Sequence, residues 1–235
     1  MIDTAVILAG GLGTRLRSVV PDLPKPMASV NGRPFLASLM EYWILQDVKK
    51  FILSVGYKHQ EIIDYFGFSF NGSRIDYVVE TTPLGTGGGL LLAKQRLDSN
   101  SPFLLLNGDT YFEVDAKRLC SFAQQVDADW CISLFKTFET SRYLGLDVGE
   151  KGEILNLRPS IKRGECFANG GVYWVNPQSL DALNFPLGNH ISLENEIFPS
   201  LTSQGQKVFG LDFNSNFIDI GIPDDYQRAS NLIAN

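Results

Sequence analysis

A chain of 235 residues is long enough for one α/β domain with a sizeable core, and no linker divides it, so we expect a single domain over residues 1–235. Its formal net charge of -6 argues against nucleic acid as the main partner, because that binding needs many Lys and Arg on one face. Hydrophobic residues make up 44% of the chain, but no apolar run reaches membrane-spanning length and no signal peptide is visible, which predicts a cytoplasmic location and no membrane partner.

The first predicted strand, Thr4 to Leu8, leads into the glycine-rich segment 8-LAGGLGTRL-16. Glycines after a strand let backbone N–H groups come close to a ligand, which is typical of a phosphate site. Farther on, Lys25 lies between two prolines that restrict its backbone, so its ammonium group has little entropy left to lose. Arg15, Arg17 and Lys25 together predict a local cationic site, although an ordinary glycine turn is the alternative for the loop alone.

Two better-known glycine loops do not fit this segment. A dinucleotide-binding fingerprint needs a third glycine where Leu16 stands, and a Walker A loop needs a Gly-Lys pair, which the chain lacks. The GGLGTRL loop followed by Pro-Lys-Pro instead resembles the signature of the sugar-phosphate nucleotidyltransferases. These enzymes join a nucleoside triphosphate to a sugar 1-phosphate and release pyrophosphate. The resemblance implies nucleotide binding by Leu8, Gly10, Gly11, Gly13, Thr14 and Arg15, and catalytic roles for Arg15 and Lys25.

The elements that follow alternate between strands and helices. Helical spacing behind Pro34 predicts a helix over 35–48, and a strand over 50–57, a helix over 59–66 and a strand over 74–80 come next. Such alternation implies parallel pairing with right-handed crossovers. We therefore expect an α/β fold with a doubly wound, mostly parallel sheet of the Rossmann-like nucleotidyltransferase type.

A second glycine-rich segment, 80-ETTPLGTGGG-89, precedes a helical pattern. A simple turn is one interpretation, because glycine punctuates loops of every kind. The resemblance implies the other, in which this segment lies beside the base and ribose of the nucleotide. On that interpretation the nucleotide-binding residues are Glu80, Pro83, Gly85, Thr86 and Gly87.

The apolar strand 103–106 delivers Asn107, Gly108 and Asp109 to its carboxyl end, which is where open α/β sheets bind ligands. An Asp at a strand end is often only a turn former. The resemblance implies instead that Asn107 and Gly108 contact the nucleotide and that Asp109 is a catalytic magnesium ligand. The first aspartate of 219-DIGIPDDY-226, Asp219, matches the second metal ligand, so Mg²⁺ is the expected cofactor.

The second part of the chain shows a different pattern. After a predicted helix at 115–127 and a strand at 129–137, the stretch 146–157 predicts a hairpin, a small antiparallel insertion suited to a sugar. The stretch 158–175 follows, in which basic residues precede a strand, and then come a helix over 191–201 with Ser192 as N-cap and a closing helix opened by Pro223. We expect a nucleotide-binding half at about 1–112 and a sugar-binding half at about 113–235.

The resemblance also implies a set of residues for the sugar phosphate. Tyr143 and Gly145 resemble a Tyr-Gly element, although Leu144 separates them, and Glu194 either contacts the sugar or only favours its helix dipole. We prefer Lys162 to Arg158 as the cation that holds the phosphate, with a solvated basic loop as the alternative. The expected sugar-phosphate residues are Tyr143, Gly145, Lys162, Asn169, Gly170 and Glu194.

Other reactive side chains are few. Cys120, Cys131 and Cys166 are odd in number and widely spaced, so we expect reduced, mostly buried thiols rather than disulfides or a zinc site. His59 and His190 fall outside every motif and are expected to be surface or structural residues. A phosphomonoester with a second pKa of about 6 is already ionised at neutral pH, so the reaction needs no catalytic histidine.

The details PLGTGGG, NGGVYW and ISLE most resemble the D-glycero-α-D-manno-heptose 1-phosphate guanylyltransferases, which implies GTP and a heptose 1-phosphate as substrates. A mannose-1-phosphate guanylyltransferase, or a uridylyl- or cytidylyltransferase, is an alternative enzyme. A nucleotide-sugar sensor or regulatory subunit is the non-enzyme alternative, although such proteins commonly lose a metal aspartate or the signature lysine. Both a monomer and a homodimer agree with the sequence.

Overall fold

The computed structural model describes residues 2–11, 13, 16, 20, 22–139, 142–143, 145–160 and 164–233, with the backbone alone over 157–160. A mixed sheet runs through the molecule in the order β11-β10-β12-β7-β1-β4-β6-β5. Strand β9 also pairs with β12, and β13 pairs with β9. In chain order its strands are β1 (Thr4–Ala9), β4 (Lys50–Val55), β5 (Ser69–Phe70), β6 (Ser73–Val79), β7 (Phe103–Asn107), β9 (Trp130–Thr137), β10 (Gly145–Val148), β11 (Ile154–Ser160), β12 (Cys166–Val175) and β13 (Val208–Asp212).

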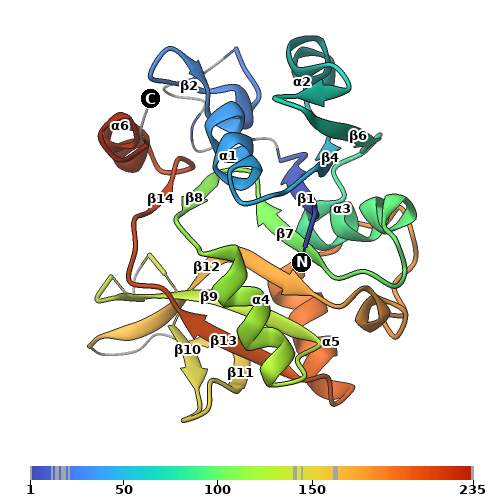
Figure 1. Cartoon of the computed structure of the whole chain (residues 1–235), viewed down its shortest axis with the longest axis vertical. Coiled ribbons are helices and arrows are strands. Elements are labelled where there is room, and N and C mark those ends of the chain that lie inside the picture. Colours follow the sequence, from blue (N-terminus) through green and yellow to red (C-terminus); the bar gives the residue numbers. More distant parts are fainter. Residues whose placement is uncertain are drawn as a thin grey trace.

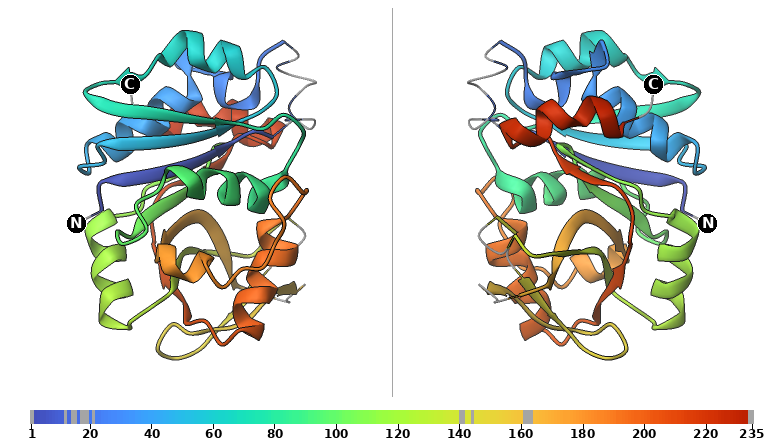
Figure 2. Two further views of the ribbon diagram at one scale, coloured as in Figure 1. Left: turned by 90° about the vertical axis from the view of Figure 1, so that its right-hand side faces the viewer. Right: turned by 90° about the vertical axis from the view of Figure 1, so that its left-hand side faces the viewer.

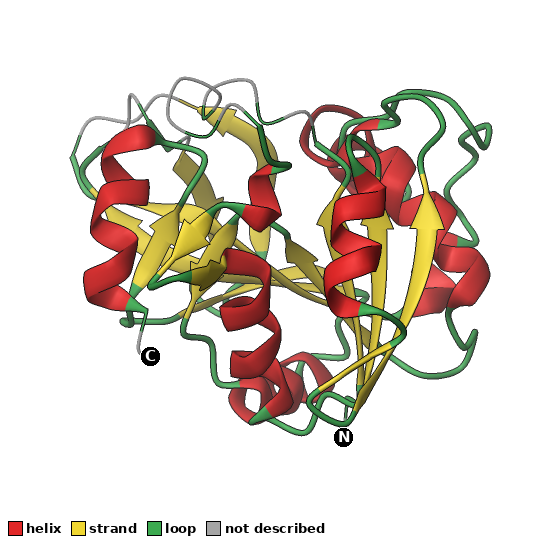
Figure 3. Ribbon diagram, turned by 90° about the horizontal axis from the view of Figure 1, so that it is seen from above, coloured by secondary structure: helices red, strands yellow, loops and turns green. Residues whose placement is uncertain are grey.

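Helices lie on both faces of this sheet (Figure 3). The α-helices are α1 (Phe35–Ile44), α2 (His59–Phe66), α3 (Gly85–Ala93), α4 (Ala116–Gln125), α5 (Phe198–Ser203) and α6 (Pro223–Leu232). Shorter turns are the 3₁₀ helices η1 (Lys25–Met27), η2 (Lys94–Arg96) and η3 (Pro177–Leu180) and the π-helix η4 (Leu193–Ile197). Within the described ranges no helix is both long and apolar enough to cross a membrane.

The centre of the sheet is parallel, as the alternation of elements predicts. Strand β1 lies between β4 and β7 and pairs with both in parallel, with Val6 opposite Ile52 on one side and Leu105 on the other. Both faces are buried: Ile7 belongs to the core around α1, whereas Val6 belongs to a second core that includes Leu90 of α3. The strand is apolar along its whole length because helices cover both faces of the sheet at this position.

The antiparallel part is larger than the predicted hairpin. Strands β10 and β11 form that hairpin, but β12 also runs antiparallel to β7, β9 and β10. The strand predicted at the end of the stretch 158–175 is β12, which starts at Cys166, and residues 158–160 belong to β11. A register shift interrupts the β12–β9 pairing between Asn169 and Tyr173, where Gly171 has a φ of 71°. This β-bulge bends the strand next to the cavities described below.

Two helices differ in length or type from the sequence-based expectation. Helix α1 ends at Ile44 rather than at 48, and Asp47 then adopts a left-handed φ of 70°. The predicted helix at 191–201 is a π-turn followed by α5. Ser192 caps it by accepting from the Asn195 N–H, and the carboxylate of Glu196 accepts from the Ser192 N–H at 2.7 Å. The wider π-turn explains why Glu196, and not residue 195, completes the capping box.

The end of the chain returns to its beginning. Figure 1 shows the red helix α6 beside the blue β2 (Ser29–Val30), and the side views of Figure 2 agree. Tyr226 on α6 donates its hydroxyl to the carbonyl oxygen of Ser29 at 2.7 Å. Just before α6, β14 (Phe217–Asp219) pairs antiparallel with β8 (Thr110–Phe112). This short ladder brings the last motif of the sequence next to the loop that follows β7.

Candidate functional site

The loops after β1 and β7 lie side by side because these strands are parallel neighbours, with Leu8 opposite Asn107. The Gly108 N–H donates to the carbonyl oxygen of Leu8 at 3.0 Å. A Cβ atom on Gly108 would lie 2.5 Å from that oxygen, so close packing of the two loops requires glycine here. The glycine of the Asn-Gly-Asp segment therefore positions its neighbours.

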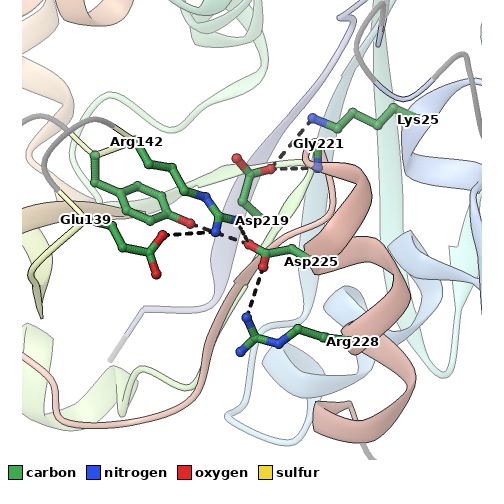
Figure 4. Close-up of polar contacts among 8 residues, drawn as sticks. Lys25, Glu139, Arg142, Asp219, Gly221, Asp225 and Arg228 are labelled. Atoms are coloured by element: carbon green, nitrogen blue, oxygen red, sulfur yellow. Dashed lines mark hydrogen bonds and ion pairs between the residues drawn. The ribbon is translucent and has the colours of Figure 1, made fainter.

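A lysine and two aspartates meet at the end of these loops. The Nζ atom of Lys25, on η1, lies 2.5 Å from Asp109 Oδ2 and 3.8 Å from Asp219 Oδ1. The Ile220 N–H donates to the backbone carbonyl of Asp109 at 3.0 Å, and Asp219 Oδ1 accepts from the Gly221 N–H at 2.7 Å (Figure 4). Only 10% of the Lys25 side chain is exposed. The structure thus brings together three predicted site residues that are far apart in the sequence.

The same arrangement fits a divalent cation. Two carboxylates, Asp109 and Asp219, converge on one position that a positive charge, the Lys25 ammonium, already occupies. Carboxylate oxygens suit Mg²⁺, which usually binds proteins through one or two carboxylates and completes its shell with water and phosphate oxygens. Among the described residues, no group of three or more His, Cys, Asp or Glu is arranged to hold a metal, so these two aspartates alone would supply the protein ligands.

A first cavity of about 540 Å³ opens beside this cluster. Most of the predicted nucleotide residues line it, namely Leu8, Gly10, Gly11, Gly13, Glu80, Pro83, Gly85, Thr86 and Asn107. Gly87 is buried behind the wall, where its N–H donates to the Ile191 carbonyl oxygen at 2.8 Å. Thr14 and Arg15 lie outside the described residues. The cavity is large enough for a nucleotide, and the nucleotide roles of these residues remain predictions.

Glu80 is held rigidly at the floor of this cavity. Its Oε2 accepts from the Leu84 N–H and its Oε1 from the Ser54 hydroxyl, both at 3.0 Å. A Cβ atom on Gly10 would run into this carboxylate, so the glycine lets the carboxylate lie directly against the backbone of the first loop. Glu80 therefore presents fixed acceptor atoms to any group that enters.

His190 also lines the first cavity, although the sequence placed it outside every motif. It is exposed, as expected of a surface residue, and its Nε2 would lie 3.1 Å from a Cβ atom on Gly85. The loop that carries it is joined to the glycine-rich loop, since the Ile191 N–H donates to the carbonyl oxygen of Leu84 at 2.7 Å. The sequence signal for His190 was its position just before the 191-ISLE-194 motif.

A second cavity of about 810 Å³ lies on the other side of the lysine–aspartate cluster. Three of the predicted sugar-phosphate residues line it: Tyr143, Asn169 and Glu194. Gly170 packs against Phe112 instead, where a Cβ atom would come within 2.5 Å of the ring, and Gly145 begins β10 without lining the cavity. Lys162 lies outside the described residues.

Asn107 and Asn169 form the wall of this cavity near the β-bulge. Asn169 donates to the Tyr173 hydroxyl at 2.7 Å and accepts from the Gly171 N–H at 3.0 Å. The Oδ1 atom of Asn107 is buried and has no hydrogen-bond partner within the described part of the chain. Buried polar atoms are almost always paired, so an unpaired oxygen on a residue that lines both cavities is unusual. Both cavities share Asn107, Thr110, Glu194 and Asp219 in their walls.

A second group of charges, which the sequence-based prediction missed, surrounds Arg142, a residue in the wall of the larger cavity (Figure 4). The Arg142 guanidinium forms an ion pair with the buried Asp225 of α6 and a second one with Glu139 at 3.1 Å. Arg228 lies 3.4 Å from the same Asp225, and the Tyr143 hydroxyl 3.5 Å from it. Burial raises the pKa of the Tyr143 phenol above its ordinary value, so this hydroxyl remains a donor at neutral pH.

Comparison with known proteins agrees with this architecture. The family model described as nucleotidyl transferase matches residues 4–235. A D-glycero-α-D-manno-heptose 1-phosphate guanylyltransferase of Aneurinibacillus thermoaerophilus is 37% identical over 225 residues, which cover 96% of each chain. The protein of the same name from Campylobacter jejuni is 35% identical and covers 94% of this chain and 96% of its own.

Solved structures give the same result. The crystal structure of HddC from Yersinia pseudotuberculosis is 36% identical, covers 98% of this chain and 99% of its own, and has a TM-score of 0.85. A second structure of that protein, with a TM-score of 0.84, is complexed with GMP-PN. The expected mostly parallel α/β fold with a Rossmann-like centre is thereby confirmed. The chain belongs to the nucleotidyl transferase family.

Proposed function

We propose that this chain transfers a guanylyl group from GTP to D-glycero-α-D-manno-heptose 1-phosphate, giving GDP-heptose and pyrophosphate. Similarity to two near-full-length relatives of that name, at 37% and 35% identity, supports the sugar substrate. The GMP-PN complex of the Yersinia protein supports the base. The observation that carries the proposal is the convergence of Lys25, Asp109 and Asp219 where the two cavities meet. The proposed location is the cytoplasm.

The chemical step requires two polyanions to be held together. An oxygen of the sugar phosphate attacks the α-phosphorus of GTP, forming a new P–O bond. The bond from that phosphorus to the bridging oxygen breaks, and pyrophosphate leaves with its electron pair. The attacking phosphate has a second pKa of about 6 and is ionised at neutral pH, so no side chain has to remove a proton. The protein contributes alignment and charge neutralisation.

The site residues divide this work between them. Lys25 provides a fixed positive charge at the reacting phosphates, because its backbone is set by Pro24 and Pro26 and only a small part of its side chain is exposed. Asp109 and Asp219 would hold Mg²⁺, which when bound neutralises charge on phosphate oxygens. Asn107 lines both cavities, and a small movement of its side chain on ligand binding would pair its buried amide oxygen, which has no partner in the described part of the chain.

Selection of the base is assigned to Glu80. Guanine carries N–H donors on its Watson–Crick edge, and an ionised carboxylate only accepts hydrogen bonds. Glu80 lies in the wall of the first cavity, and its two oxygens are already oriented by Leu84 and Ser54. A fixed acceptor favours guanine over a base that offers an acceptor at the same position.

Pyrophosphate release in Mg²⁺ tests the proposal directly. GTP, UTP, CTP, ATP and dTTP are each paired with the 1-phosphates of manno-heptose, mannose, glucose and an N-acetylsugar, with Asp109→Asn as the matched inactive control. Release confined to GTP with the heptose phosphate supports the reaction and both substrates. Release with GTP and mannose 1-phosphate retains the chemistry and overturns the sugar assignment. Tight nucleotide binding without release from any pair indicates a sensor or regulatory subunit.

A further inference from the structure

We propose that Arg142 binds the phosphate group of the sugar substrate and that Asp225 is the positioning residue that holds its guanidinium in place. The inference deepens the proposed function and rests on it, because it concerns the second substrate of that reaction. It assigns a role to the residue that directly precedes the Tyr143–Gly145 element and whose contacts depend on the packing of α6.

The charges in the larger cavity are the first argument. Its described walls contain two carboxylates, Glu194 and Asp219, and a single cationic side chain, Arg142. A sugar phosphate carries a charge of about -1.5 to -2 at pH 7. Because the two carboxylates repel this anion, it needs a positive partner on its own side of the site, and Lys25 lies among the metal-site carboxylates.

The geometry of Arg142 is the second argument. Its side chain is 24% exposed and reaches the cavity wall from the segment just before β10. Its Nε–H is buried and has no hydrogen-bond partner within the described part of the chain. A planar guanidinium suits the oxygens of a phosphate, to which it can donate two parallel hydrogen bonds. Because the buried Nε–H has no partner in this part of the chain, a turn of the guanidinium toward a substrate oxygen would pair it without breaking a hydrogen bond of Nε.

Asp225 explains how the guanidinium is held in that position. Only 6% of its side chain is exposed, and it pairs with Arg142 and, at 3.4 Å, with Arg228 (Figure 4). The ring of Tyr143 supports the same guanidinium, whose Cζ lies 5.1 Å from the ring centroid. Holding Arg142 before the substrate arrives removes part of the entropy cost of binding. The segment 219-DIGIPDDY-226 thus supplies a carboxylate to the metal site and another to the sugar-phosphate site.

Anchoring of α6 is the competing interpretation, since a buried Asp between two Arg side chains also ties a helix to its neighbours. Arg228 provides the matched control. It contacts the same carboxylate, is 65% exposed and does not line the larger cavity. An anchor would be weakened by loss of either arginine, whereas a phosphate ligand is lost only with Arg142.

The test compares Arg142→Gln, Arg142→Lys, Asp225→Asn and Arg228→Gln with the parent enzyme. We expect Arg142→Gln to raise the KM for the sugar phosphate by ~10- to 100-fold, the effect of losing hydrogen bonds between charged groups. The KM for GTP should change little, whereas the melting temperature should fall, because the buried Asp225 loses one of its two arginine partners. Arg142→Lys should recover part of the loss, and Arg228→Gln should behave like the parent.

Two further readouts separate positioning from direct contact. Asp225→Asn should raise the same KM by ~3- to 10-fold, and its effect should largely vanish in the Arg142→Gln background, as expected for residues that act through one another. In the reverse reaction, Arg142→Gln should raise the KM for the nucleotide sugar and leave that for pyrophosphate unchanged.

Equal loss of stability in Arg142→Gln and Arg228→Gln, with an unchanged KM for the sugar phosphate, overturns the inference and leaves the proposed function intact. A rise in both substrate KM values by the same factor also overturns it. A parent protein that binds no sugar phosphate in calorimetry and turns over no substrate pair overturns both proposals together.

Discussion

The hydroxyl of Thr86 donates a hydrogen bond to Glu194 Oε2 at 3.2 Å and accepts one from the Leu193 N–H at 2.8 Å. Thr86 lies in the first turn of α3 and lines the smaller cavity, and Glu194 of η4 lines both cavities. These two segments are therefore joined by hydrogen bonds where the cavities share a wall, and we expect a change at Thr86 to affect both cavities.

Thr86→Val tests this connection, because it keeps the shape of the side chain and removes the hydroxyl. The Leu193 N–H then loses its acceptor, which should lower the free energy of unfolding by about 1–3 kcal/mol. The KM for both proposed substrates should rise. Urea unfolding and steady-state kinetics measure the two effects, and Thr86→Ser should restore most of each. A Val variant with normal stability and a change in only one KM would show that the two segments act separately.

The lysine–aspartate cluster predicts a large effect on turnover. Asp109→Asn or Lys25→Ala should reduce kcat by ~10²–10⁴-fold in Mg²⁺, as expected for removal of a preorganised electrostatic group. Lys49→Ala, which removes an exposed lysine, is the control for loss of a positive charge. Pyrophosphate release at saturating substrates gives the comparison, and near-normal turnover of either site variant would contradict the assignment.

Variants of two adjacent glycines in the first loop distinguish a role in ligand binding from a role in packing. A Cβ atom on Gly11 would meet nothing within 4 Å, whereas one on Gly10 would collide with the Glu80 carboxylate. Gly11→Ala should therefore leave the free energy of unfolding within about 0.5 kcal/mol of the parent and weaken nucleotide binding. Gly10→Ala should lower both the free energy of unfolding and the affinity for the nucleotide. Calorimetric titration with nucleotide measures the affinity, and thermal unfolding without nucleotide measures the stability. Unaltered binding by Gly11→Ala would argue against a ligand at that loop.

Glu80 predicts how strongly the enzyme prefers guanine. Inosine triphosphate lacks the exocyclic amine of guanine, so the parent should use it less well than GTP. Glu80→Gln keeps an acceptor for the Leu84 N–H but loses the charge and one acceptor, and it should reduce that preference by ~10-fold or more. The ratio of kcat/KM for the two nucleotides is the measurement. An unchanged ratio would assign base selection to another group.

The raised pKa values of two cysteine thiols lead us to expect a loss of stability at alkaline pH. Burial raises the pKa of Cys120 from 9.0 to about 11 and that of Cys131 to about 12. Unfolded thiols ionise from about pH 9 while the folded ones stay protonated, so the free energy of unfolding is unaffected below pH 9 and falls above it. The slope is at most about 1.4 kcal/mol per pH unit for each thiol. Urea unfolding from pH 8 to 10.5 should show a shallower slope in Cys120→Ala and Cys131→Ala, and equal slopes would contradict this account.

The parts of the site that follow from local sequence were predictable. An apolar run that ends in glycines or in Asn-Gly-Asp indicates a buried strand and the loop at its carboxyl end, and β1 and β7 confirm both. The hairpin of β10 and β11 was predictable in the same way. Motifs quoted for the family also gave Lys25, Asp109 and Asp219, which the structure brings together.

The rest depends on contacts between distant segments. The β8–β14 ladder, which aligns Asp219 with Thr110, consists of strands too short to show a period of two. The pairing of Arg142 with Asp225 requires α6 to return to the cavity, and no spacing in the sequence reports that. Glycines were also ambiguous: the family motifs implied ligand contact by Gly87 and Gly108, with a turn as the alternative, and the structure shows both glycines packed closely against neighbouring segments.

The wall that the two cavities share has a consequence for product inhibition. Asn107, Thr110, Glu194 and Asp219 border both cavities, so under the proposed function a nucleotide sugar would occupy the two cavities at the same time. Such a product excludes each substrate, whereas pyrophosphate excludes only the triphosphate. Accumulating GDP-sugar would therefore compete with both substrates and slow its own formation through the shared wall of the active site.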